Sequence, residues 1–125
     1  MAVKYKELKD RKLRNQREFI VHTLSFDECF NQDVFSGAYE ENRKIVSKIP
    51  DYKINDIVRI ARGKMSEEEL KVANLTYGLN GELLCNLDNE SVAEMLRETP
   101  TQIFLIKIES LRKVKPFLEA LVSLS

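Results

Sequence analysis

The chain has few of the residues that build metal or redox sites. Its 125 residues include one histidine, His22, and two cysteines, Cys29 and Cys85, which lie far apart and have no CxxC partner. This set offers no cluster of thiolates and imidazoles for zinc. We therefore expect no metal centre and no cofactor. Both cysteines are interpreted as buried free thiols, with a disulfide as the open alternative.

Glycine and proline are also scarce, at four and three residues. Their scarcity leaves long uninterrupted stretches, which favour helices over many short strands. No run approaches about 18 apolar residues, and the lysine-rich N-terminus lacks an apolar signal core. With 43% hydrophobic and 32% charged residues, the sequence predicts a packed, soluble, intracellular all-α protein with no membrane partner.

The chain has no net charge, but its charges are unevenly spread. Residues 18–42 carry six acids and no base, whereas residues 1–17 hold Glu7 and Asp10 against seven bases. We call these seven the basic arm: Lys4, Lys6, Lys9, Arg11, Lys12, Arg14 and Arg17. The basic arm can contact nucleic acid or an acidic protein surface. A solvated helix face explains it equally well.

Apolar spacing and capping residues predict a series of helices. In the first half we expect helices over residues 5–23, 25–35 (opened by the capping-box pair Ser25 and Glu28), 39–49 (ended by Pro50) and 54–62 (ended by Gly63). In the second half we expect a helix that begins at the capping box Ser66–Glu69, ends at Tyr77 and is capped by Gly78, followed by a turn at Asn80-Gly81. A short helix is expected from Asp88 to Arg97, and the next helix begins at Thr99-Pro100. We expect a separate terminal helix beyond Pro116.

Two short helices joined by a tight turn suggest a helix-turn-helix unit. The run from Met65 to Leu79, MSEEELKVANLTYGL, is followed after a loop by the stretch from Asp88 to Val114. Together, over residues 65–118, they resemble region 4 of bacterial primary sigma factors, the module that binds the −35 promoter element and the β flap of RNA polymerase. The resemblance implies an all-α helical bundle with a C-terminal helix-turn-helix.

Several landmarks of that family fall in register. Asp88 occupies the position at which the family has a helix-capping threonine. Thr99 occupies the position of the threonine that caps the recognition helix. Val92-Ala93 matches the Val-Gly step where the two helices approach closely. Leu96 takes the core aromatic position, and Pro116 falls close to the family's proline. The resemblance therefore divides the chain into a helical extension of unknown role over 1–64 and the helix-turn-helix domain over 65–125.

The recognition helix departs from the family where sigma factors read bases. Arginines and a glutamate of the family are replaced here by Pro100, Thr101, Gln102, Phe104 and Leu105. Residues 88–113 hold four bases against five acids, so few phosphates can be neutralised. The candidates left for DNA contact are Thr99, Thr101, Gln102, Lys107, Arg112 and Lys113.

Phe104 and Leu105 are the candidate partner-binding residues. If Ile103 and Ile106 point into the core, the 100° step of a helix places the intervening pair on other faces. Large apolar side chains on such a face suggest a protein partner, such as another transcription factor. Cover by the N-terminal half of this chain is the equally weighted alternative.

The leading hypothesis is a sigma-like transcription regulator, bacterial or phage-encoded, in the bacterial cytoplasm. It would bind RNA polymerase core at the β flap, with reading of promoter DNA altered or lost. One alternative is a sequence-specific DNA-binding regulator that acts without polymerase, using the basic arm for affinity. The other is a helical adaptor between proteins.

An enzyme is the least supported class. His22 lies among apolar neighbours and is interpreted as a satisfied, partly buried histidine rather than a catalytic base. The acidic run from Glu67 to Glu69 fits stabilisation of a helix start. Gly63-Lys64 lacks the upstream glycine of a phosphate-binding loop. We therefore assign no catalytic residue.

Overall fold

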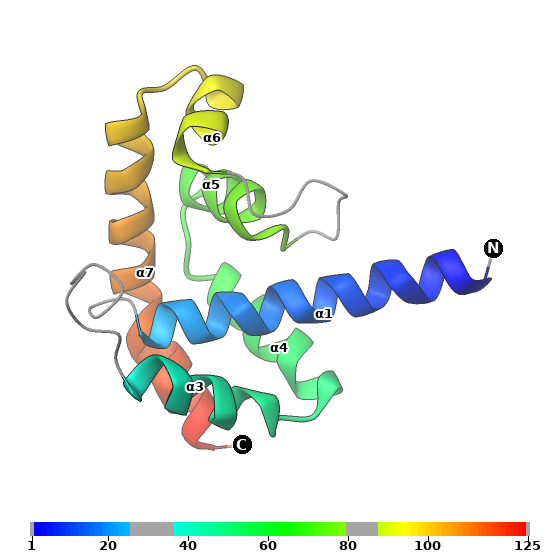
Figure 1. The fold of residues 1–125 in the computed structure, drawn as a ribbon. Coiled ribbons are helices and arrows are strands. Elements are labelled where there is room, and N and C mark those ends of the chain that lie inside the picture. Colours follow the sequence, from blue (N-terminus) through cyan, green and yellow to red (C-terminus); the bar gives the residue numbers. More distant parts are fainter. Residues whose placement is uncertain (1, 26–36, 80–87, 125) are drawn as a thin grey trace.

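The computed structural model describes residues 2–25, 37–79 and 88–124, with side chains from residues 9 and 39 onward in the first two stretches. These residues form helices and no strands (Figure 1): α1 (Ala2–Leu24), α3 (Gly37–Ser47), α4 (Asp51–Arg62), α5 (Glu67–Tyr77), α6 (Asn89–Leu96) and α7 (Pro100–Ser123). The all-α prediction is confirmed for this part of the chain. None of its helices combines the length and apolar character that crossing a membrane requires.

The predicted boundaries agree with the helices to within a few residues. The capping signals of the second half are all present: Ser66 and Glu69 form the capping box, and Gly78 ends α5 at φ 65° in the left-handed region. Gly63 follows α4 but is right-handed, with φ −65°. The Asn80-Gly81 turn, both cysteines and the helix predicted over residues 25–35, apart from Ser25, lie outside the described residues.

The expected break at Pro116 is wrong, because α7 continues through it to Ser123. Proline cannot donate a backbone hydrogen bond, so the Arg112 carbonyl receives none from position 116. Pro116 is exposed, whereas Leu111, Val114 and Leu118 are buried along the opposite face. Continuous burial of that face outweighs the local cost of the proline.

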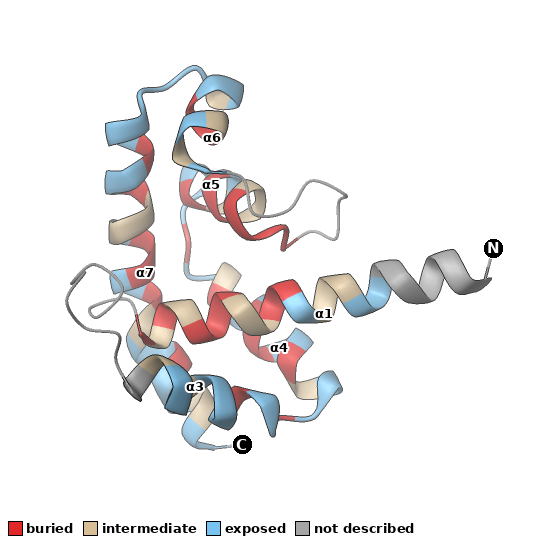
Figure 2. Cartoon of the chain, viewed as in Figure 1, coloured by how far each residue is buried: buried red, intermediate tan, exposed pale blue. Residues whose placement is uncertain are grey.

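The larger hydrophobic core joins both halves of the chain. Helix α1 crosses α4 and packs on α3, α5 and α7 (Figures 1 and 2). The buried side chains of this core come from α1, α3, α4, α5, α7 and the residue Leu79. They include Phe19, Ile20, Val46, Ile54, Val58, Tyr77, Leu79, Leu111, Val114 and Leu118. The predicted division at residue 64 therefore does not coincide with a gap in the core.

Arg17 of α1 fixes the junction between α3 and α4. Its guanidinium donates to the carbonyl oxygens of Val46 at 2.6 Å and Ile49 at 2.9 Å, and it pairs with the Asp51 carboxylate at 2.5 Å. The carbonyls at a helix end have no partner within the helix, so a side-chain donor satisfies them. Arg17, grouped by sequence with the basic arm, thus serves the fold.

We expect Arg17→Met to lower the free energy of unfolding by about 2 kcal/mol, because two carbonyls lose a charged donor while the aliphatic packing is kept. Arg14→Met, on the exposed neighbouring turn, is the matched control and should change stability by less than about 0.5 kcal/mol. Urea denaturation of both variants measures the difference. Equal stabilities would contradict the role given to Arg17.

Pro116→Ala should raise stability by about 1 kcal/mol or more, because the new backbone N–H can bond to the Arg112 carbonyl within an intact helix. Thermal unfolding of the two proteins provides the measurement. A lower melting temperature for the alanine variant would show that α7 requires its proline.

Candidate functional site

Local chemistry at both helix ends sets the turn between α6 and α7. The Asp88 carboxylate accepts from the Ser91 N–H at 2.7 Å, which starts α6. Arg97 ends it with φ 57°, and the Glu98 N–H donates to the Ala93 carbonyl at 2.9 Å. The Thr99 hydroxyl then accepts from the Gln102 N–H at 3.1 Å and starts α7. Only three residues thus separate the two helices.

A second, smaller core holds α5, α6 and α7 together. Its buried members are Val72, Val92, Ala93, Ile103 and Ile106. The side chain of Ala93 is small, which suits a position where helices approach closely. We call residues 67–77 and 88–114, the helices around this core, the α5–α7 unit.

The polar residues predicted to contact DNA fall into two groups. Thr99, Thr101 and Gln102 are exposed at the first turn of α7. The three bases, Lys107, Arg112 and Lys113, all have polar partners within the protein.

Two of these three bases are hydrogen-bonded to a neighbouring side chain, and Arg112 forms only a long, exposed ion pair. Lys113 donates to Glu69 at 2.8 Å, and Arg112 lies 3.9 Å from Glu109. Lys107 is half-buried and donates to Asn89 at 3.2 Å, and its burial lowers its pKa. These contacts reduce the positive charge that the α5–α7 unit can offer to phosphates.

The Lys113–Glu69 pair shows how firmly one base is engaged. Burial alone would raise the pKa of Glu69, but hydrogen bonds from Lys113 and from Ser66 outweigh it, so the pKa is lowered. The same carboxylate accepts from the Ser66 backbone N–H at 2.8 Å. Lys113 therefore links α7 to the start of α5.

Phe104 and Leu105 are exposed, with 37% and 53% of their surfaces accessible. Their neighbours Ile103 and Ile106 point into the smaller core, as the helical spacing predicted. Met95 of α6 is 51% exposed. The described N-terminal helices do not bury this pair, so the α5–α7 unit presents large apolar side chains to solvent.

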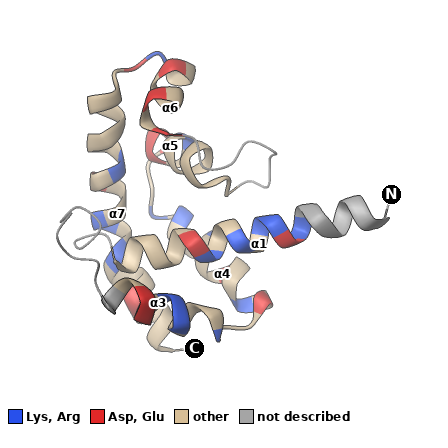
Figure 3. Ribbon diagram, viewed as in Figure 1, with Lys and Arg blue, Asp and Glu red and all other residues tan. Residues whose placement is uncertain are grey.

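The charges of the α6–α7 segment do not favour DNA. Figure 3 shows acidic residues on α6 and at the start of α5, whereas the exposed first turns of α7 carry few charges of either sign. Residues 88–113 contain four basic and five acidic residues. A surface of this kind gains little affinity from phosphate neutralisation.

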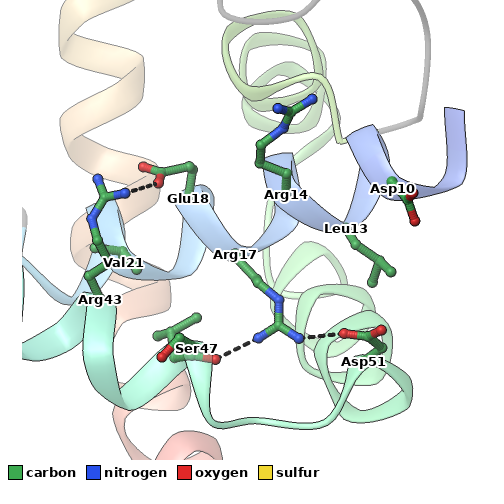
Figure 4. Close-up of a pocket in the computed structure, with 10 residues that line it drawn as sticks. Asp10, Leu13, Arg14, Arg17, Glu18, Val21, Arg43, Ser47 and Asp51 are labelled. Carbon is green, nitrogen blue, oxygen red and sulfur yellow. Dashed lines mark hydrogen bonds and ion pairs between the residues drawn. The ribbon is translucent and has the colours of Figure 1, made fainter. Parts of the chain in front are cut away.

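A cavity of about 340 Å³ lies between α1, α3 and α4 (Figure 4). Four of its charged lining residues are paired with each other: Arg17 with Asp51, and Arg43 with Glu18 at 2.9 Å. Asp10 and Arg14 also line it and form no ion pair among the described residues. Leu13 and Val21 provide apolar walls. The two ion pairs link α1 to α3 and to α4 across this cavity.

His22 connects α1 to α5. Its Nδ1 lies 2.6 Å from the Tyr77 hydroxyl, and the two rings meet edge to face. Burial lowers the pKa of His22 below its usual value, the nearby Lys107 lowers it further, and Glu18 partly opposes them. The expectation of a partly buried histidine with a polar partner is confirmed. The partner itself, 55 residues away, had no signal in the sequence.

Comparisons with protein-family models, with curated proteins and with solved structures found no match. The likeness to sigma region 4 therefore rests on the residues that carry it in the sequence.

Stability should fall as the pH drops below about 6.5, the usual pKa of histidine. The folded protein binds the His22 proton less tightly than the unfolded chain does, so acid favours unfolding. This contribution to stability is fully present above the pKa that His22 has in the unfolded chain. It decreases as the pH falls from that value to the lower pKa of the folded protein. Urea midpoints between pH 7.5 and 5 measure it.

His22→Gln removes the titrating ring and should flatten this pH dependence. The glutamine amide can still bond to the Tyr77 hydroxyl, which limits the accompanying structural change. An equally steep loss of stability in this variant would assign the pH dependence to other groups.

Proposed function

We propose that the chain is a transcription regulator that binds RNA polymerase core at the β flap through the α5–α7 unit, with promoter reading altered or lost. Exposure of Phe104 and Leu105, on a helix whose Lys107 and Lys113 are bound to other side chains, carries the proposal. Exposed aromatic and aliphatic side chains supply binding energy to protein partners, whereas DNA requires free cations.

The α5–α7 unit has two apolar faces, and one is already occupied. Tyr77, Leu111 and Val114 are buried in the larger core against α1. A protein partner of the intact chain would therefore use the face that carries Phe104 and Leu105. In this proposal that face binds a protein partner, whereas in sigma factors it contacts the bases of promoter DNA.

The turn chemistry supports a helix-turn-helix as the scaffold of this surface. Asp88 and Thr99 cap the two helices at the positions where the sigma family caps its own. Short connections closed by caps orient two helices with little freedom. We infer that the chain keeps the family's scaffold and has changed the residues on its outer face.

Leu105→Glu should weaken binding to immobilised RNA polymerase core, and to the isolated β flap, by about tenfold or more, because a carboxylate would have to be desolvated in an apolar interface. Ile45→Glu is the matched control. Ile45 of α3 is 48% exposed, close to the value for Leu105, but lies outside the α5–α7 unit. Biolayer interferometry measures both variants.

Three results would reject the proposal: failure of the unmodified chain to bind core and flap, an equal effect of Ile45→Glu, or an unchanged affinity of Leu105→Glu. Binding to other proteins without polymerase would instead favour the helical adaptor.

A further inference from the structure

Four bases of α1 have no anionic partner in the described structure. Lys9, Arg11, Lys12 and Arg14 appear in no ion pair among the described residues. In contrast, Arg17, one turn further along, is bound to Asp51. We call residues 9–14, which also contain Asp10 and Leu13, the basic segment.

The basic segment lies where α1 leaves the body of the protein. Helix α1 continues amino-terminally to Ala2 and extends beyond the other helices (Figure 1). Lys9 and Arg14 are exposed, whereas Arg11 and Lys12 are partly exposed. Figure 3 shows the basic residues along this part of α1. A large ligand can therefore approach it.

The four bases do not form a single stripe. At about 100° per residue, positions 9, 11, 12 and 14 spread over more than half of the helix circumference and leave free the side on which Leu13 packs. A helix that docks on a protein concentrates its apolar residues on one face. The one aliphatic side chain of the basic segment, Leu13, already packs against the protein's own core. Within residues 9–14, therefore, no apolar side chain is left for a protein partner.

We propose that the basic segment binds the phosphate backbone of duplex DNA. Cations around a projecting helix suit a ligand that presents phosphates on more than one side, as the walls of a DNA groove do. The contact is electrostatic and independent of base sequence, because lysine and arginine bound to phosphates do not read bases. It does not depend on the proposed polymerase contact, which uses the opposite half of the chain.

The test measures binding of the full chain to a fluorescent random-sequence DNA duplex at 50 to 200 mM salt. The logarithm of the affinity should fall linearly with the logarithm of the salt concentration. Replacing Lys9, Lys12 and Arg14 together by glutamine should reduce that slope by about 2 to 3, since each lost phosphate contact removes about 0.9. The affinity at low salt should fall about tenfold or more.

The matched control replaces Lys44, Lys48 and Lys71 by glutamine. These three are exposed, lie outside α1 and carry the same total charge. Circular dichroism shows whether each triple variant keeps its helices. The proposal is supported if the α1 variant alone shows the reduced salt slope.

The proposal fails if the unmodified chain does not bind the duplex, if both triple variants lose the same slope, or if binding is insensitive to salt. Tighter binding to an acidic protein than to DNA would also overturn it. None of these results affects the polymerase assay, because that assay uses Leu105→Glu with the basic segment intact.

Discussion

Tyr77 is the residue through which the two halves of the chain depend on each other. It ends α5, is buried, and packs its ring edge-on against Phe19 with centroids 5.2 Å apart. Its hydroxyl meets His22, so one side chain supplies both apolar and polar contacts to α1. Because buried polar groups need partners, this pair also fixes how far α1 can slide along α5. The contact thus joins the α5–α7 unit to the helix that carries the basic segment.

Local chemistry made much of the fold predictable. Caps at Ser66, Asp88 and Thr99 are short-range interactions, so their residues lie together in the sequence and reveal the helix starts. The error at Pro116 has the opposite origin, because burial of Leu111 and Leu118 on one face is a tertiary effect that overrides a local rule. The larger core could not be predicted, since no sequence pattern pairs Phe19 with residues more than fifty positions away.

The candidate site was predictable in part for the same reason. Helical spacing placed Phe104 and Leu105 away from the core, and both are exposed. The roles of charged residues were not predictable, because pairing depends on the assembled helices: Lys113 meets Glu69 across 44 positions, and Arg17 meets Asp51 across 34. A net charge of zero therefore gives no indication that the chain has a basic surface on α1 and an apolar one on α7.

Helix α7 contributes its first half to the smaller core and its second half to the larger one. A fragment that began at residue 65 would keep the turn between α6 and α7 but leave Leu111, Val114 and Leu118 without their cover. Such a fragment would associate non-specifically with other proteins through apolar side chains that are buried in the whole chain. Dissection by truncation would therefore create an artificial binding face, whereas point substitutions preserve the natural one.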